Sequence, residues 1–357
     1  MEQRELVLVA RDVAPSKALL KLGEAGWPLG IVQHRILGNG TSIDTGVVHT
    51  TLNGLRYKAC LVSALSSHPH FAETEIRACE EALRRGIPYG FYADTWGIVA
   101  GRPHFTEKIK HGASFLFVVN EKEARRAREY FPNAKIVASG NPMQEDWFFP
   151  KRTYIDVRLQ MGVLPEQIAI LCPSGKDLAV NLIHFSGAIE AAGKLNAKAI
   201  VFLAIHPGDP PEHLKHYEFL AKYAGLVSGT SIRLVTKDAI PCSELLVGCD
   251  VVVASMSTID CEAACQRKPV IDFMSQTALG VHSVLDGGWG WELATEGASF
   301  PIYGDTGKLR TAIELLLNKE SSMRREQIRF QKRLFPTPTE RGVAVRLMRE
   351  TVLGFLK

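Results

Sequence analysis

The segment 250–271 compresses a strand, a short polar turn, a helix and a second strand into one stretch of chain. Positions 251–253 are three valines, the β-branched run typical of a strand that is buried in a parallel sheet. Ser255, Ser257 and Thr258 follow where the chain turns into the helix. This order of elements is a βαβ unit, so the segment constrains its part of the chain to a parallel α/β sheet.

The turn in this unit predicts an anion site. Unpaired N–H groups at the start of the helix and the positive end of its dipole favour a phosphate there, and the Ser257 and Thr258 hydroxyls can donate further hydrogen bonds. Glu262, one helical turn later, is placed to accept both hydroxyls of a ribose. The alternative is that Ser257 or Thr258 only caps the helix and that Glu262 is a solvated residue.

A second loop points to the same chemistry. The apolar run 199–205 ends in His206-Pro207-Gly208, which cannot continue a strand. Ligands of open α/β sheets bind outside the carboxyl ends of the strands, so we expect His206 and Ser257 to face one pocket from neighbouring strands. His206 would then donate to a diphosphate or neutralise a leaving group. The alternative is a turn histidine that the backbone satisfies.

Composition indicates a globular two-domain protein. The chain of 357 residues exceeds what one hydrophobic core usually organises, and 46% of its residues are hydrophobic. With 42 basic and 38 acidic residues, a net charge of +4 is too small to indicate a nucleic-acid partner. Basic clusters at 84–85, 125–128 and 324–333 leave peripheral contact with an anionic membrane open, although solvated helix faces explain them as well.

The cysteines indicate a reducing compartment. Seven cysteines form no paired framework, which is typical of reduced thiols in a cytoplasmic protein. Cys261 and Cys265 lie one helical turn apart, but no second pair completes a zinc set, so we expect no metal. The charged N-terminus lacks a secretory signal, and no apolar stretch approaches the roughly 18 residues of a membrane span. We therefore expect a cytoplasmic protein, with the inner face of the membrane as a further location.

Strands and helices alternate through both halves of the chain, which predicts two doubly wound parallel sheets and an α/β fold. Gly140, Pro142 and Pro150 interrupt the alternation and place the boundary near 145–155. We divide the chain into a first domain at 1–148, a second at 149–340, and a final helix at 341–357 that could pack back on the first. The predicted strands are 6–10, 30–33, 58–63, 88–92, 115–119 and 135–138, then 168–172, 199–205, 231–235, 250–254 and 269–273.

These features together resemble the GT-B fold of sugar-nucleotide enzymes, in which two Rossmann-like domains face a cleft. The resemblance rests on the doubly wound halves, Gly-Asn-Pro at 140–142, His-Pro at 206–207, the Ser/Thr turn with its Glu-containing helix, and Lys-Pro-Val at 268–270. Within that fold the chain is similar to glycosyltransferases of the lipid-A-disaccharide synthase, bacterial sialyltransferase and CDP-glycerol transferase kind. It is also similar to hydrolysing UDP-N-acetylglucosamine 2-epimerases.

The resemblance implies a nucleotide-sugar donor, UDP- or CMP-linked, as co-substrate and no separate cofactor. The second domain would hold it, with His206 near the phosphates, Ser257 and Thr258 on them, and Glu262 on the ribose. The loop that carries Ser174 and Lys176 is similarly placed to approach the diphosphate, unless Ser174 is a cap and Lys176 is solvated. The chain has no Gly-x-Gly-x-x-Gly fingerprint and no Walker A loop, which disfavours a dehydrogenase or a kinase.

In this fold the acceptor lies against the first domain, and a base from its loops deprotonates the acceptor hydroxyl. Four groups in three loops are chemically able, namely Asp12, His68, His70 and Asp94. We favour Asp94, because Tyr92 and Trp96 beside it would stack on a sugar ring and shield the carboxylate from water. The alternative is that Asp94 caps a turn.

The sequence thus predicts a metal-independent glycosyltransferase that moves a sugar to a hydroxyl of a glycan, lipid or small-molecule acceptor, as in cell-envelope polysaccharide synthesis. The second hypothesis is a hydrolysing 2-epimerase. That family's Arg-Glu stretch is absent near position 210, where Pro210-Pro211-Glu212 stands. The third hypothesis is a non-catalytic sugar-nucleotide or glycan binding subunit that works with a membrane partner.

Overall fold

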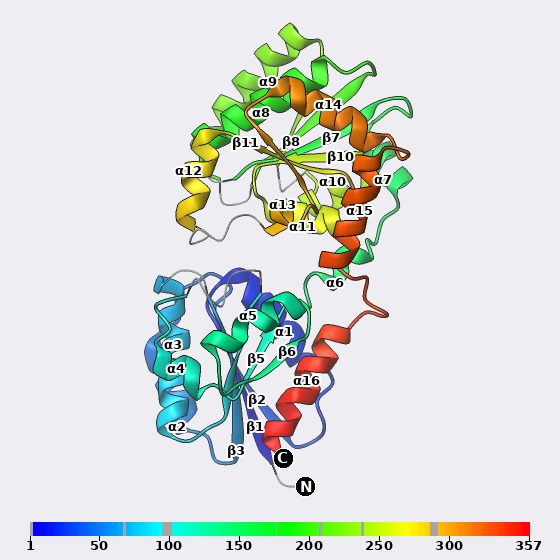
Figure 1. Ribbon diagram of the computed structural model, residues 1–357. Helices are drawn as coiled ribbons and strands as arrows, with labels where there is room; N and C mark the ends of the chain where they lie inside the picture. The colour runs from blue at the N-terminus through cyan, green and yellow to red at the C-terminus, as the bar shows by residue number, and fades with distance from the viewer. Residues whose placement is uncertain are drawn as a thin grey trace. The chain divides into compact units, whose positions relative to one another are not determined.

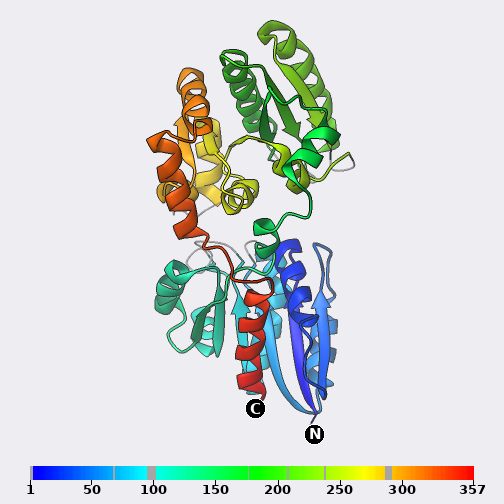
Figure 2. The same ribbon diagram turned by 90° about the vertical axis from the view of Figure 1, so that its right-hand side faces the viewer.

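The computed structural model describes residues 3–66, 69–94, 102–175, 177–206, 209–236, 239–285 and 292–357, and only the backbone of Thr45, His70, Phe71 and 282–285. Two compact units divide the chain (Figures 1 and 2). Unit 1 comprises Met1–Asp146 and Pro338–Lys357, and unit 2 comprises Trp147–Thr337. Within the described ranges, each helix is too short or too polar to cross a bilayer.

Unit 1 is built on a parallel six-stranded sheet in the order β2-β1-β3-β4-β5-β6. Its strands are β1 Arg4–Ala10, β2 Ile31–Leu37, β3 Lys58–Ala64, β4 Tyr89–Tyr92, β5 Phe115–Val118 and β6 Lys135–Ala138. Its helices are α1 Val13–Gly23, α2 Thr45–Asn53, α3 Pro69–Arg84, α4 Glu107–Gly112, α5 Glu121–Tyr130 and α16 Val343–Leu356, and α6 Glu145–Phe148 crosses the boundary to unit 2.

The two faces of this sheet are covered by different helices. Apolar residues of α2, α3, α4 and α5 pack on one face, and those of α1 and α16 pack on the other. The C-terminal helix α16 is therefore part of unit 1 (Figure 1). Glu145 fixes its start, because the carboxylate accepts the backbone N–H groups of Gly342 at 2.7 Å and Ala344 at 2.6 Å.

Unit 2 contains a second parallel sheet of six strands in the order β12-β11-β10-β7-β8-β9. Its strands are β7 Ile168–Pro173, β8 Ala199–Ala204, β9 Ser231–Val235, β10 Val251–Ala254, β11 Val270–Met274 and β12 Phe300–Tyr303. Its helices are α7 Tyr154–Met161, α8 Leu178–Gly193, the 3-10 turn η1 Pro211–His213, α9 Leu214–Ser228, α10 Cys242–Gly248, α11 Thr258–Cys265, α12 Gln276–Leu285, α13 Glu292–Thr295, α14 Thr306–Leu317 and α15 Ser322–Leu334.

The helices of unit 2 also divide between two faces. Residues of α8, α9 and α14 pack on one face of the sheet, and residues of α7, α10 and α11 pack on the other. The predicted α/β class with two doubly wound parallel sheets is confirmed.

The strand order of unit 2 corrects one prediction. His206 follows β8 and Ser257 follows β10, but these strands are not neighbours, because β7 lies between them and pairs with both. The chain runs outward from β7 through β8 to β9 and then returns to the other side of β7. This reversal is a topological switch point, where the loops after β7 and β10 diverge and leave a crevice.

Candidate functional site

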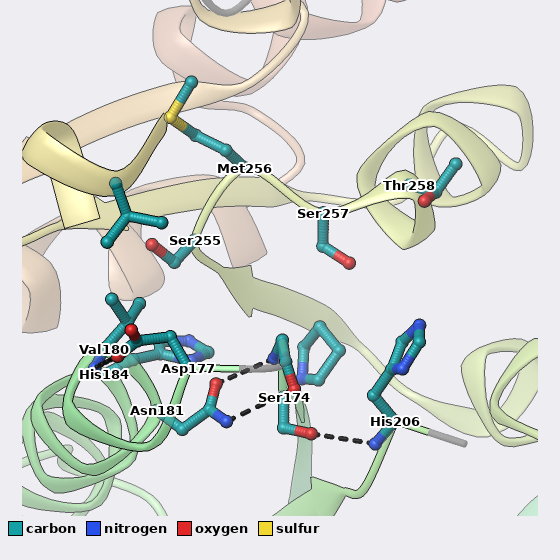
Figure 3. A pocket seen from close by; sticks show the side chains of 13 residues that line it. Ser174, Asp177, Val180, Asn181, His184, His206, Ser255, Met256, Ser257 and Thr258 are labelled. Carbon is teal, nitrogen blue, oxygen red and sulfur yellow. Dashed lines mark hydrogen bonds between the residues drawn. The ribbon is translucent and has the colours of Figure 1, made fainter. Parts of the chain in front are cut away.

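A cavity of about 630 Å³ lies at this switch point of unit 2 (Figure 3). Its size falls in the range of roughly 300–1,000 Å³ that is typical of small-molecule sites. The loops after β7, β8 and β10 and the helices α8 and α12 form its walls. It is lined by Pro173, Ser174, Gly175, Asp177, Val180, Asn181, His184, His206, Ser255, Met256, Ser257, Thr258 and Val281.

The turn between β10 and α11 is held from beneath by two carboxyl groups. Met256 has a φ of 54°, an uncommon conformation for a residue with a side chain. Its N–H donates to Asp272 Oδ1 at 3.0 Å, and the N–H of the N-cap residue Ser257 donates to Asp260 Oδ2 at 2.8 Å. These two hydrogen bonds therefore hold the strained turn in place without a ligand.

Asp260 and Asp272 are both fully buried. Burial, followed by the negative charge of Asp272, raises the pKa of Asp260 well above its ordinary value. The closeness of the two buried carboxyl groups therefore disfavours two negative charges beneath the turn. An anion above the turn consequently meets less repulsion.

The turn presents hydrogen-bond donors to the cavity. Ser255, Ser257 and Thr258 line it, and Ser257 lies at the N-terminus of α11. The Ser255 hydroxyl is buried and has no partner among the described residues. A buried hydroxyl without a partner is unfavourable, and rotation of the Ser255 side chain toward the cavity would let it donate to a bound anion.

The opposite wall is a hydrogen-bonded network centred on Asp209. The Asp209 carboxylate accepts from the hydroxyls of Ser174 at 3.1 Å and Tyr217 at 2.7 Å, and from Nδ2 of Asn181 at 3.4 Å. The Ser174 oxygen in turn accepts the backbone N–H of His206 at 2.8 Å. Ser174 therefore uses its only proton inside the protein, whereas the His206 side chain is exposed at the cavity.

Asn181 and His184 were not predicted from the sequence. Both are buried on α8 and line the cavity. Their spacing of three residues places them together on the buried face of α8, where the other residues are apolar or glycine, and this pattern was the available signal.

Glu262 lies on α11 one turn after Thr258 and outside the set of residues that line the cavity. Its side chain is nearly buried, with 8% of the residue exposed, and burial raises its pKa to about 7. No hydrogen bond satisfies this carboxyl group among the described residues. It is therefore open to a ligand that brings hydroxyl donors.

Asp94 in unit 1 lies just after β4 and is half-buried. Burial and then the charge of Asp12 raise its pKa to about 6, while Arg102 opposes the rise. Nδ2 of Asn141 donates to the backbone oxygen of Asp94 at 2.8 Å and so ties this loop to the Gly-Asn-Pro segment after β6. Asp94 thus has the pKa of a working general base.

Tyr92 does not have the predicted role. Its side chain is fully buried in the core under α1 and α16, so it cannot stack on a sugar ring. The reason is strand alternation in a sheet that is covered on both faces, which turns Tyr92 inward.

Glu75 of α3 joins the ends of β1 and β3. Its carboxyl group accepts the N–H groups of Arg11 at 3.2 Å and Ser66 at 3.1 Å, and the Ser66 hydroxyl at 2.6 Å. Burial raises its pKa to about 8 in spite of these bonds. Glu75 therefore supports the loop of Asp12, another candidate base.

His68, Trp96 and Lys176 lie outside the described residues, and so does the side chain of His70.

None of the family models or curated proteins compared with the chain matches it. Solved structures match it over nearly its whole length. A glycosyltransferase from Rickettsia africae is 12% identical, with 100% of this chain and 99% of that chain covered and a TM-score of 0.62. The UDP-GlcNAc 2-epimerase of Methanocaldococcus jannaschii, in complex with UDP-GlcNAc and UDP, is 15% identical, with coverage of 99% and 100% and a TM-score of 0.59. HepE of Anabaena, in complex with UDP, is 11% identical, with coverage of 99% and 100% and a TM-score of 0.58. At these identities the likeness establishes the architecture, and the chain has the GT-B fold that its sequence predicts.

Proposed function

We propose that this protein is a metal-independent glycosyltransferase that moves a sugar from a nucleotide donor to a hydroxyl of a glycan, lipid or small-molecule acceptor. The observation that carries the proposal is the cavity at the switch point of unit 2, which is lined by the start of α11 and by the serine residues of the turn before it. Both features favour a bound phosphate.

The chemistry follows from the charge that develops when the sugar leaves. The departing diphosphate gains negative charge. The N–H groups and dipole of α11, the hydroxyls of Ser255, Ser257 and Thr258, and the His206 ring as a hydrogen-bond donor would stabilise that charge. Glu262 would accept the ribose hydroxyls. These groups supply the electrostatic stabilisation that a metal ion provides in other transferases.

Deprotonation of the acceptor is assigned to Asp94, with Asp12, His68 and His70 as the other candidates. A carboxylate with a pKa of about 6 is largely ionised at neutral pH and still accepts a proton readily. We further propose a cytoplasmic enzyme, since all seven cysteines are free thiols, and the basic clusters leave contact with the inner face of the membrane as part of the proposal.

Hydrolysis with epimerisation is the second candidate reaction. The matched structure from Methanocaldococcus jannaschii is a 2-epimerase with UDP-GlcNAc and UDP bound, and it supports UDP as the nucleotide for either reaction.

Titration calorimetry with UDP, CMP, CDP and GDP tests the donor site directly. We expect UDP or CMP to bind, and the absence of binding by all four would contradict the proposal. Incubation with UDP-N-acetylglucosamine then separates the two reactions. Release of free N-acetylmannosamine and UDP without an acceptor would favour the epimerase, whereas UDP release that requires an acceptor hydroxyl would favour the transferase.

A further inference from the structure

His184 gives the cavity a fixed hydrogen-bond acceptor. The ring is 2% exposed, and its Nε2 lies 2.7 Å from the backbone oxygen of Val253. Because a carbonyl oxygen can only accept, Nε2 must carry the proton and Nδ1 must carry a lone pair. Burial lowers the pKa of His184 to about 4, so the ring is neutral at physiological pH.

The lone pair of His184 reaches the cavity. None of the described residues donates to Nδ1, and this atom is not among the fully buried atoms that lack a partner. Since the ring lines the cavity, the cavity is the space that Nδ1 faces.

Asp177 adds acceptors at the same end. It lies two turns before His184 as the N-cap of α8, where Oδ1 accepts the N–H of Val180 at 2.9 Å. Its second oxygen has no partner among the described residues. The carboxylate also occupies the positive end of α8, which disfavours an anion there. This end of the cavity is therefore suited to a group that donates hydrogen bonds.

The α11 turn has the opposite chemistry, because it offers N–H groups and hydroxyls. A ligand with a phosphate at α11 would place hydroxyl or N–H donors at α8. A nucleotide sugar has hydroxyl donors on its glycosyl group and N–H donors on its nucleobase. Glu262, the proposed ribose ligand, is on α11, and α11 packs with α10 on the face of the sheet opposite α8. The nucleoside thus belongs on the α10 side, which leaves the α8 side to the sugar.

We propose that His184 and Asp177 bind hydroxyls of the glycosyl group of the donor, so that the end of the cavity between α8 and α12 is the sugar subsite. In Figure 3 these residues lie on the opposite side of the view from His206 and Thr258. The inference rests on the proposed function, because it takes the diphosphate to lie at α11.

Two substitutions remove the acceptors with little change elsewhere. In His184→Gln the amide N–H replaces Nε2–H toward Val253, but no acceptor remains at the position of Nδ1. In Asp177→Asn the cap of α8 is kept, because asparagine caps as well as aspartate. His216→Gln on the exposed face of α9 and Asp305→Asn at the N-cap of α14 are matched controls. Thermal melting verifies folding, and if His184→Gln does not fold, Asp177→Asn carries the test.

Calorimetry with UDP and UDP-glucose is the test. We expect the wild type to bind UDP-glucose more tightly than UDP. His184→Gln and Asp177→Asn should each lose about 3- to 10-fold in affinity for UDP-glucose and bind UDP unchanged, as one lost hydrogen bond predicts. Equal affinity of the wild type for both ligands, unchanged UDP-glucose binding in the variants, or an equal loss for both ligands would overturn the inference, and the last result would assign the acceptors to the nucleobase. A wild type that binds neither of these ligands, and none of CMP, CDP and GDP, would overturn the donor site itself.

Discussion

The hydroxyl oxygen of Ser174 accepts the backbone N–H of His206 at 2.8 Å, and the Ser174 proton goes to the buried Asp209. This pair joins the loop after β7 to the loop after β8. The position of His206 at the cavity thus depends on a hydrogen-bonded network in the cavity wall.

Ser174→Ala should reduce the free energy of unfolding by about 1–3 kcal/mol, because the N–H of His206 loses its acceptor and Asp209 loses a donor. Urea denaturation measures this change, with Ser186→Ala on the exposed face of α8 as the matched control. If both variants are as stable as the wild type, the network does not have the strength assigned to it here.

Asp94 should give the pH–rate profile its acid limb. A base must be ionised to act, and burial raises the pKa of Asp94 to about 6, so turnover should fall as pH decreases below about 6. Asp94→Asn should reduce turnover by about 10²- to 10⁴-fold and leave nucleotide affinity unchanged. Steady-state kinetics measures the turnover and calorimetry measures the nucleotide affinity. A variant that keeps wild-type turnover would exclude Asp94 as the base.

Asp12 should set the pH at which turnover falls on the acid side of the pH–rate profile. Its negative charge raises the pKa of Asp94, so Asp12→Asn should lower that pKa and shift the acid limb to lower pH. Asparagine still caps α1, where Asp12 accepts the N–H of Val13 at 2.7 Å. A limb that stays in place or moves to higher pH would count against coupling of the two carboxylates.

The sequence predicted the turn between β10 and α11 because one short segment contains all of its parts, from the valines of β10 to the start of α11. It did not predict the strand β12 Phe300–Tyr303, because Pro301 cannot donate a backbone hydrogen bond and so argues against a strand. The proline is tolerated because β12 lies at the edge of the sheet. Helix α2 Thr45–Asn53 was missed because its threonines and valines favour strands, whereas Asp44 caps it by accepting the N–H of Gly46. Strand order is a property of the whole sheet, so the position of β7 between His206 and Ser257 was not visible in either segment.

Nucleotide binding should release a proton from Glu262. Burial raises the pKa of Glu262 to about 7, and ribose hydroxyls that donate to the carboxylate would stabilise its charged form and lower that pKa. Affinity for UDP should therefore increase as pH rises through about 7. Calorimetry in two buffers of different ionisation enthalpy measures the released proton, which Glu262→Gln should abolish. Proton uptake on binding would contradict the ribose assignment.

Glu75 should make the protein less stable as pH rises. The folded chain keeps its proton up to a pKa of about 8, whereas the unfolded chain loses it near the ordinary value of 4.5. Between these values the folded state binds more protons, so the free energy of unfolding decreases as pH rises from about 4.5 to 8. Denaturation at several pH values across this window should show that the free energy of unfolding changes less with pH in Glu75→Gln than in the wild type. An unchanged slope would assign the dependence to other groups.

The most direct test of the donor site is a crystal structure with UDP. We predict a diphosphate at the start of α11, within hydrogen-bonding distance of the Ser255 hydroxyl and the Ser257–Thr258 turn, with the ribose toward Glu262. UDP bound elsewhere on the chain, or a cavity that stays empty at saturating UDP and at saturating CMP, would contradict the account.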